Sequence, residues 1–170
     1  MNNSNFLYDS PIGLIAIHAT GDHIDSILFA NSGRGPVVDK AEIKNVKTTL
    51  PIIQNCVTQL EEYFEGKRKD FDFNFLQSGT AFQEKIWNEL THIPYGRTIS
   101  YLELSKRIGN VKAIRAVGTT NGKNQLCIVV PCHRVIGSSG SLVGYGGELW
   151  RKKWLLEHEA KFANGVQVLF

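Results

Sequence analysis

The apolar residues of the first 30 positions are grouped into runs bounded by turn-forming residues, and these runs predict β-strands. The stretch FLYDSPIGLIAIHATGDHIDSILFA offers two apolar runs, separated by the turn-forming tripeptide TGD. From residue 48 to residue 65 the apolar positions recur at helical spacing, and Gly66 ends the predicted helix. The alternating segment FDFNF predicts one more strand. Residues 1–76 therefore predict a small N-terminal α/β domain with an antiparallel sheet and a helix.

Beyond this domain the pattern becomes mainly helical. Thr80 is a predicted N-cap with Gln83 completing a capping box, and Ser100 starts a second helix that ends at Gly109. After a short link, AIRAVGTTNGKN predicts a third helix, so that the last two form a helix-turn-helix. The segment WRKKWLLEHEAKF predicts a final amphipathic helix. We expect a mainly helical C-terminal domain over residues 77–170, and an α/β (α+β) protein as a whole.

The composition is that of an ordinary soluble globular protein, with 42% hydrophobic and 21% charged residues. No window approaches the roughly 18 apolar residues that a membrane helix needs, and the N-terminus lacks the pattern of a secretion signal. We therefore expect no membrane partner and a location in the cytoplasm, or in the nucleus if the source is eukaryotic. The formal net charge of +3 permits nucleic-acid binding without indicating it strongly.

Three cysteines, Cys56, Cys127 and Cys132, narrow the possible chemistry. An odd number without a secretion signal argues against a disulfide framework, and the lack of a CxxC pair argues against zinc, so we expect no metal site. Cys132 precedes His133, and a reactive thiol needs a base or a positive charge nearby. Side chains of neighbours on an extended segment point in opposite directions, so contact would need a turn or a bridging water. By itself the dipeptide favours a buried core cysteine over a nucleophile.

Other candidate groups are ambiguous when taken singly. Ala116 and Gly118 leave a thin helix beside Arg115, which fits either approach to a DNA groove or tight packing against another helix. The loop GSSGSLVGYGGE is neither a GxGxxG nor a Walker motif and suits the flexible rim of a pocket. Glu159 on the last helix would ordinarily face solvent, and Tyr101 would ordinarily be a core aromatic residue.

Seven segments taken together resemble the O6-alkylguanine-DNA alkyltransferase family, also called methylated-DNA–protein-cysteine methyltransferases. They occur in family order and at family spacing between Gly79 and Glu159, and they are GTAFQEKIW, IPYGRTISY, RIGN, AIRAVG, PCHRVIG, GYGG and RKKWLLEHE. Each is weak alone, but their joint occurrence is highly specific. Residues 1–75 match only in general style, and the resemblance implies a ribonuclease-H-like N-terminal domain.

The resemblance implies a one-way transfer. A guanine that carries an alkyl group on O6 is flipped out of the duplex, and the cysteine takes the alkyl carbon by in-line displacement. The protein itself is the acceptor, so it acts once and needs no cofactor. The implied partner is double-stranded DNA, bound through the minor groove largely without sequence preference by a protein that is a monomer in solution. O4-alkylthymine as a second substrate and cooperative binding along DNA stay open.

The resemblance also assigns catalytic roles. Cys132 is the acceptor, His133 acts as its base through a water molecule, and Glu159 orients the histidine and stabilises its charged form. Asn124 braces the turn before the active strand. The apolar VV pair is expected to form that strand, which holds the sulfur in place, and Pro131 is expected to stiffen its turn. Arg134 is expected to hold local structure rather than touch DNA.

A second set of residues would bind the lesion and the DNA. The Tyr101 hydroxyl donates to guanine N3, the carbonyls of Cys132 and Val135 accept from the guanine amino group, and Arg115 fills the gap left in the base stack. Tyr145 and the backbone amide of Gly146 close the pocket. The small residues Ala116 and Gly118 let the helix enter the minor groove.

Some positions depart from the family pattern. Gly146 stands where some relatives have serine, Gln125 follows the bracing asparagine where proline is frequent, and Ile114 is bulkier than the alanine of some relatives. The zinc-binding N-terminal cysteines of some members are missing. None of these departures removes a reacting group.

Two other functions compete with alkyl transfer. One is a non-reacting alkyltransferase-like protein that binds lesions, but such relatives usually replace the cysteine that this chain keeps as Cys132. The other is a Cys–His hydrolase, which would leave the helix-turn-helix without a purpose.

Overall fold

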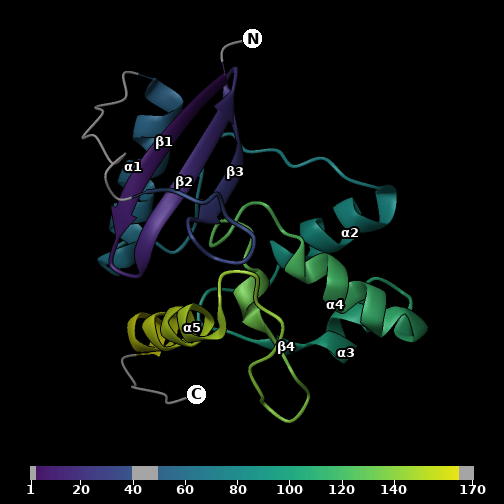
Figure 1. Cartoon of the computed structure of the whole chain (residues 1–170). Coiled ribbons are helices and arrows are strands. Elements are labelled where there is room, and N and C mark those ends of the chain that lie inside the picture. Colours follow the sequence, from purple (N-terminus) through teal and green to yellow (C-terminus); the bar gives the residue numbers. More distant parts are fainter. Residues whose placement is uncertain (1–2, 40–49, 165–170) are drawn as a thin grey trace. The chain divides into compact units, whose positions relative to one another are not determined.

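The computed structural model describes residues 3–39 and 50–164, and the chain divides into two compact units, Met1–Gln77 and Ser78–Phe170 (Figure 1). The units are described separately. The fold class expected from the sequence is confirmed, because an antiparallel sheet and a helix are followed by a mainly helical unit. Among the described residues, no helix combines the length and the apolar character needed to cross a bilayer.

The first unit contains a three-stranded antiparallel sheet in the order β1-β2-β3. Its strands are β1 (Asn3–Ser10), β2 (Gly13–Thr20) and β3 (His23–Phe29). The first apolar run of the sequence therefore forms two strands, β1 and β2. The chain reverses between Ser10 and Gly13, where the Ser10 hydroxyl donates to the Gly13 carbonyl at 2.5 Å and Gly13 takes a φ of 109°.

Helix α1 (Pro51–Phe64) packs on this sheet and buries Ile53, Leu60 and Tyr63. The predicted helix began at residue 48, and residues 48 and 49 lie outside the described part of the chain. The helix ends just before Gly66, as expected, and the φ of 75° at Gly66 lets the next backbone amide reach back to the Glu62 carbonyl at 2.8 Å.

The segment FDFNF does not form the predicted strand. It makes one isolated parallel bridge, between Phe75 and Ile24. The Gln59 side chain binds both the backbone amide and the carboxylate of Asp72, which holds the segment against α1 and away from regular pairing. Alternation of apolar residues indicates that one face of a segment is buried, but it does not show that the segment pairs with a strand. In this segment the rings of Phe71, Phe73 and Phe75 pack against one another in sequence.

The second unit has four α-helices in the part that the structure describes: α2 (Ala81–Leu90), α3 (Tyr101–Arg107), α4 (Ile114–Gly122) and α5 (Leu149–Asn164). The predicted capping box of α2 is present, with Thr80 and Gln83 each binding the other's backbone amide. Ser100 caps α3 as expected, and Gly109 follows its end with a φ of 78°. A 3-10 turn, η2 (Val111–Ala113), joins α3 to α4.

Two very short strands, which the sequence did not predict, tie the cysteine segment to α3. Strand β4 (Ile99–Ser100) pairs in parallel with β5 (Val135–Ile136), which follows the 3-10 turn η3 (Cys132–Arg134). Because Ser100 is also the N-cap of α3, the pairing fixes the start of that helix against the residues that follow Cys132.

Candidate active site

Cys132 lies at the start of η3, and it is 3% exposed. The VV run before it is not the predicted strand. Ile128 takes a φ of 73°, and the Val129 amide donates to the Cys127 carbonyl at 2.9 Å, which makes a γ-turn with a strained central residue. Pro131, at φ −82° and ψ 64°, forms a second γ-turn of the commoner inverse kind, closed by the Cys132 amide and the Val130 carbonyl at 2.8 Å.

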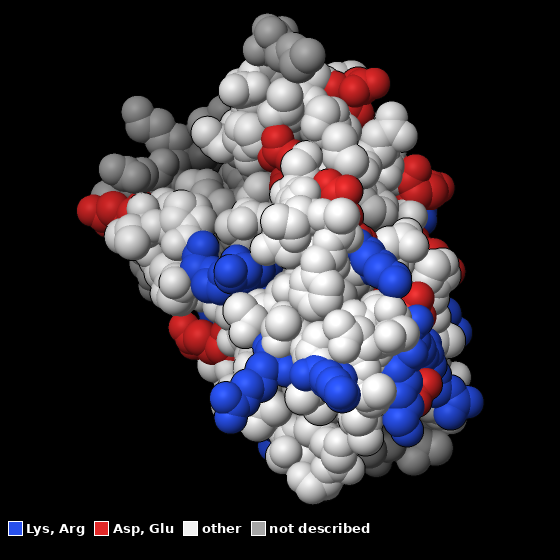
Figure 2. Space-filling view, turned by 90° about the vertical axis from the view of Figure 1, so that its right-hand side faces the viewer, with Lys and Arg blue, Asp and Glu red and all other residues white. Residues whose placement is uncertain are grey.

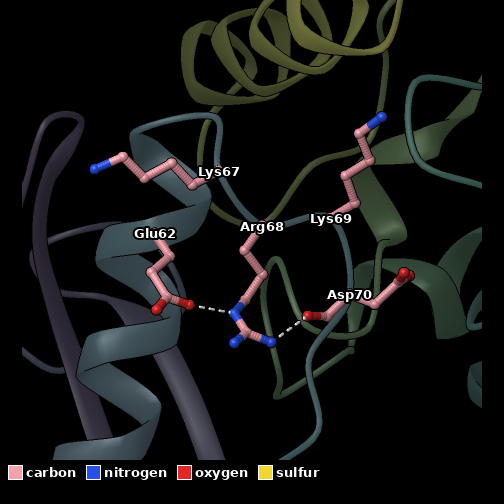
Figure 3. Close-up of a pocket in the computed structure, with 5 residues that line it drawn as sticks. All are labelled: Glu62, Lys67, Arg68, Lys69 and Asp70. Atoms are coloured by element: carbon pink, nitrogen blue, oxygen red, sulfur yellow. Dashed lines mark hydrogen bonds and ion pairs between the residues drawn. The ribbon is translucent and has the colours of Figure 1, made fainter.

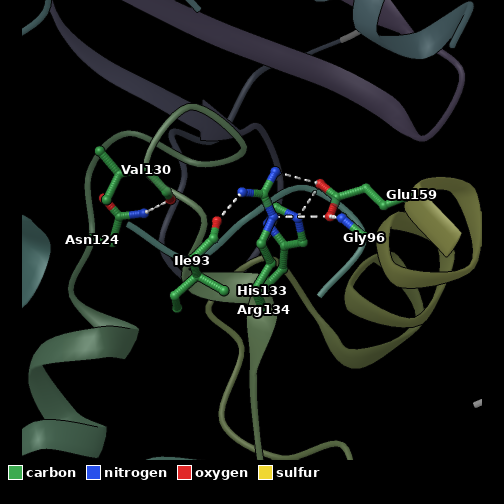
Figure 4. A network of polar contacts seen from close by, with 7 residues as sticks. All are labelled: Ile93, Gly96, Asn124, Val130, His133, Arg134 and Glu159. Carbon is green, nitrogen blue, oxygen red and sulfur yellow. Dashed lines mark hydrogen bonds and ion pairs between the residues drawn. The ribbon is translucent and has the colours of Figure 1, made fainter. Parts of the chain in front are cut away.

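Asn124 holds these turns together. Its side-chain nitrogen donates to the Val130 carbonyl at 2.7 Å and to the Leu126 carbonyl at 3.3 Å, and its oxygen accepts from the Leu126 amide at 3.0 Å. The Val130 oxygen therefore binds Asn124 (Figure 4) and also the backbone amide of Cys132. The side chain of Asn124 thus supports the backbone position of the cysteine.

His133 and Glu159 are both buried, and they are joined by a hydrogen bond of 2.7 Å between His133 Nε2 and Glu159 Oε1. Burial lowers the pKa of His133, with opposition from the nearby carboxylate. A neutral imidazole that donates through Nε2 has its lone pair on Nδ1. Within the described residues, this Nδ1 atom is buried and has no hydrogen-bond partner. The ring is therefore arranged to accept a proton at Nδ1.

Arg134 supplies the counter-charge for Glu159. Its Nε and Nη2 atoms donate to the two carboxylate oxygens at 2.9 and 3.0 Å, and its Nη1 donates to the Ile93 carbonyl at 2.6 Å (Figure 4). Burial raises the pKa of Glu159, but the hydrogen bonds of His133 and Arg134 and the guanidinium charge outweigh it and hold that pKa well below its usual range. Glu159 is therefore ionised and does not face solvent.

The backbone at Gly96 completes the surroundings of this carboxylate. Its amide donates to Glu159 Oε2 at 3.3 Å. A side chain at this position would begin 2.4 Å from Ala163 Cβ, and the φ is 74°, so glycine is required for the chain to pass this close to α5.

Tyr101 and Lys152 share one acceptor, the Val143 carbonyl, and Lys152 also binds the segment that follows Cys132. The Tyr101 hydroxyl donates to the Val143 carbonyl at 3.0 Å, and Lys152 Nζ donates to the carbonyls of Val143 at 2.8 Å and Val135 at 2.6 Å. Burial lowers the pKa of Lys152 to about 8, and the neighbouring Cys132 opposes this shift. A positive charge therefore lies close to the sulfur.

The glycine-rich loop from 137 to 147 crosses the same region. Gly144 takes a φ of 62°, and a side chain there would begin 3.2 Å from the Tyr101 hydroxyl. Tyr145 is buried and Gly146 is half-buried, in the same loop that presents the Val143 carbonyl to Tyr101 and Lys152. The loop and the cysteine segment are thus joined through Tyr101 and Lys152.

Arg115 and Ala116 are exposed on the first turn of α4, and Gly118 is half-buried near the Tyr101 ring. The structure does not bring Arg115 to the cysteine, which fits a residue that acts outside the pocket.

The segment that contains α3 and α4 exposes several basic side chains. The exposed ones between residues 101 and 123 are Lys106, Arg107, Lys112, Arg115 and Lys123. Figure 2, which shows the right-hand side of Figure 1, has most of its Lys and Arg side chains in the lower half of the view.

A second charged cluster lies in the first unit, around a hollow of about 480 Å³ (Figure 3). Arg68 binds Glu62 through Nε at 2.5 Å and the Asp70 carbonyl through Nη1 at 3.0 Å, while Lys67 pairs with Glu65 at 2.5 Å. The charges of these groups compensate one another. Among the described residues, no group of three or more His, Cys, Asp or Glu side chains is placed to hold a metal ion.

Two residues of the site escaped the sequence analysis, Asn121 and Lys152. Asn121 Nδ2 donates to the Cys132 carbonyl at 3.2 Å. The helical period does contain a signal for Lys152, because it occurs three, four and seven positions before the buried residues Leu155, Leu156 and Glu159 and so shares their face of α5. Lysine on such a face needs polar partners, which here are backbone carbonyls.

The fold and the site together define a class of protein: a two-unit α+β chain with a buried Cys–His–Glu arrangement and a basic pair of helices in its second unit. Two family models match the chain. They are described as 6-O-methylguanine DNA methyltransferase, ribonuclease-like domain, over residues 6–77, and 6-O-methylguanine DNA methyltransferase, DNA binding domain, over residues 81–161. The chain belongs to the 6-O-methylguanine DNA methyltransferase family.

Curated relatives agree with this assignment. The methylated-DNA–protein-cysteine methyltransferase of Mycobacterium tuberculosis is 50% identical over 163 residues, which cover 95% of each chain. The protein of the same name from Methanosarcina acetivorans is 40% identical, over 90% of this chain and 96% of its own. Among solved structures, the O6-methylguanine methyltransferase of M. tuberculosis matches with a TM-score of 0.82 and 37% identity over 97% of both chains. The M. tuberculosis protein in complex with DNA matches with a TM-score of 0.81 and 40% identity, over 93% of both chains.

Proposed function

We propose that this protein repairs DNA directly, by transferring the alkyl group from O6-alkylguanine in double-stranded DNA to its own Cys132. The observation that carries the proposal is the buried group of His133, Glu159 and Arg134 beside the cysteine, with an unpartnered Nδ1 on the histidine. Membership of a methyltransferase family supports the reaction class. Residues 77–170 would carry DNA binding and transfer, and residues 1–76 would support them.

The transfer begins with activation of the thiol. The Cys132 proton passes through a water molecule to His133 Nδ1, and Glu159 stabilises the imidazolium that forms. Arg134 keeps Glu159 ionised, and the charge of Lys152 favours the thiolate. These groups together make a nucleophile from a thiol that is otherwise buried.

The thiolate then attacks the alkyl carbon. A new S–C bond forms as the C–O6 bond breaks, and the electron pair of that bond stays with the guanine. The Tyr101 hydroxyl would exchange the Val143 carbonyl for guanine N3, while the carbonyls of Cys132 and Val135 bind the amino group and Tyr145 and Gly146 cover the base. No group regenerates the thiol, so one molecule repairs one lesion, and no cofactor takes part.

DNA binding is assigned to α3 and α4. Their exposed basic side chains suit phosphate contacts, which bind without regard to sequence. The small residues Ala116 and Gly118 suit entry into the minor groove, and Arg115 would fill the space of the flipped base. The protein would act as a monomer in solution, in the compartment that holds DNA: the cytoplasm or, in a eukaryote, the nucleus. Cys132 disfavours a lesion sensor that does not react.

The intact mass of the protein tests the proposal. After incubation with duplex DNA containing one O6-methylguanine, the protein should gain one CH₂ unit on the Cys132 peptide, in a stoichiometric and final reaction. Cys132→Ser should gain nothing, whereas Cys56→Ala, which alters a buried cysteine of α1, should react like the wild type. Repeated turnover or a mass gain on another residue would contradict the proposal, and tight DNA binding without any gain would favour a lesion sensor.

A further inference from the structure

Asn121 lies in the last turn of α4, six positions after Arg115, and is 1% exposed. Its side-chain nitrogen donates to the carbonyl of Cys132 at 3.2 Å. That carbonyl can only accept a hydrogen bond, so the atom of the Asn121 amide that faces it is the nitrogen and not the oxygen. The amide oxygen therefore occupies the other end, held about 2.2 Å from the nitrogen by the covalent geometry.

This oxygen has no partner. Among the described residues, Asn121 Oδ1 is buried and accepts no hydrogen bond. Asn124, the neighbouring buried asparagine, shows the usual condition, because its nitrogen donates to two carbonyls and its oxygen accepts from the Leu126 amide. A buried acceptor left without a donor is unfavourable and uncommon, and such groups concentrate where a ligand completes them.

The local donors are committed elsewhere. The Tyr101 hydroxyl donates its one proton to the Val143 carbonyl at 3.0 Å, so its hydrogen bond with the Asn121 side chain is one that it accepts. Lys152 Nζ donates to the carbonyls of Val143 at 2.8 Å and Val135 at 2.6 Å. The carbonyl of Cys132 has a second lone pair besides the one that Asn121 engages. Asn121 Oδ1 is thus an acceptor without a donor among the described residues, and it belongs to the same amide that binds the Cys132 carbonyl.

The chemistry of the lesion identifies that donor. Alkylation at O6 removes the proton from N1 of guanine, so the exocyclic 2-amino group is the one N–H donor left on the base. O4-alkylthymine and O6-alkylhypoxanthine have no N–H donor on the base at all. A free acceptor beside the Cys132 carbonyl is therefore matched by guanine lesions and by neither of the others.

We propose that Asn121 is a specificity residue whose Oδ1 accepts, together with the Cys132 carbonyl, from one N–H of the 2-amino group of the flipped guanine, while the other N–H binds the Val135 carbonyl. The inference rests on the proposed alkyl transfer and names the substrate class that the same site prefers. Guanine lesions would be repaired faster than lesions without the amino group, because those leave Oδ1 buried and unpaired throughout the reaction.

The test compares two duplexes that differ in a single group, one with O6-methylguanine and one with O6-methylhypoxanthine, which lacks the 2-amino group. Single-turnover transfer to Cys132 is followed by intact mass for the wild type, Asn121→Leu and Asn88→Leu. Leucine is similar in size to asparagine and has no acceptor. Asn88 is exposed on α2, so its variant is the matched control.

The wild type and Asn88→Leu should prefer O6-methylguanine. Asn121→Leu should lose about 5- to 10-fold in rate on O6-methylguanine and change less than about twofold on O6-methylhypoxanthine, which is the loss expected for one hydrogen bond. Equal losses on both duplexes would overturn the inference, since Asn121 would then merely hold the Cys132 carbonyl. If the leucine variant does not fold, Asn121→Ala repeats the comparison. Equal rates of the wild type on the two duplexes would overturn the inference independently. Failure of the wild type to react with either duplex would instead remove the proposed function.

Discussion

Arg134 donates two hydrogen bonds to the carboxylate of Glu159, from Nε at 2.9 Å and from Nη2 at 3.0 Å, and both residues are buried. Arg134 therefore supplies a counter-charge for Glu159 even while His133 is neutral. The histidine can stay neutral at rest, with Nδ1 ready to accept a proton, and still find a carboxylate beside it once it becomes charged. The sequence suggested only that Arg134 holds local structure, and this contact gives that interpretation its physical content.

Arg134→Met should destabilise the protein strongly. The change leaves the Glu159 carboxylate buried with its main counter-charge removed, which typically costs about 3–5 kcal/mol. Urea unfolding of the variant and the wild type measures the difference. Arg107→Met is the matched control, because Arg107 lies at the surface and pairs with Glu103 at 3.1 Å, an arrangement that contributes less than about 1 kcal/mol. Similar losses in the two variants would contradict a structural role for the Arg134–Glu159 pair.

Stability should rise with pH through the range just below 6.5. Burial lowers the pKa of His133 from its ordinary 6.5, so at pH values between the two the unfolded chain binds a proton that the folded chain does not. The free energy of unfolding therefore falls as the pH is lowered through this window. Urea titrations at several pH values measure the slope, and His133→Gln should flatten it. A variant with an unchanged slope would show that the histidine is not neutral at rest.

Lys152→Met should shift the pH dependence of transfer. Lys152 has a pKa lowered by burial to about 8, so below that pH it carries a charge beside Cys132 that favours the thiolate. Without this charge, the pH at half-maximal rate on free O6-benzylguanine should move up by roughly one unit. Lys153→Met alters the exposed neighbour on α5 and should leave the profile unchanged. An unshifted profile in Lys152→Met would mean that the lysine only supports the loop carbonyls.

Arg115→Ala should affect duplex DNA and the free base differently. Arg115 is exposed on α4 and lies outside the pocket, so its proposed role exists only when a base leaves the stack. Transfer from a duplex should slow by at least about tenfold, or about 1.4 kcal/mol, while transfer from free O6-benzylguanine should be unchanged. Lys123→Ala removes a similar charge at the end of the same helix and should weaken binding only modestly. Equal losses on both substrates would refute the role.

The elements that the sequence predicted well are those with local signals. Thr80, Ser100, Gly66 and Gly109 set helix ends through contacts within a few residues, and each was found where the sequence placed it. The alternating FDFNF failed because period-two burial does not require strand pairing, and a side chain from α1 binds the segment instead. The hairpin at Gly13 was missed because a two-residue turn interrupts the apolar run only briefly.

In the site, too, features with local sequence signals could be predicted, and features that depend on distant segments could not. The sequence could place His133 beside Cys132, but whether Glu159 faces solvent or the histidine depends on the rotation of α5, which local periodicity determines only weakly. Burial of Asn121 and Lys152 depends on which carbonyls other segments present, and those carbonyls carry no sequence signature. The γ-turns at Ile128 and Pro131 were mistaken for a strand because branched apolar residues suit both.

Much of the hydrogen bonding around the sulfur uses main-chain oxygens, those of Val130, Cys132, Val135 and Val143. Every amino acid offers such an oxygen, so exchange of one apolar side chain for another at 130, 135 or 143 leaves the acceptor in place. Genetic drift at these positions should therefore be nearly neutral so long as the volume is kept. The site therefore tolerates substitutions where its acceptors are backbone oxygens. It is sensitive to substitution at the few residues whose side chains donate hydrogen bonds to those oxygens.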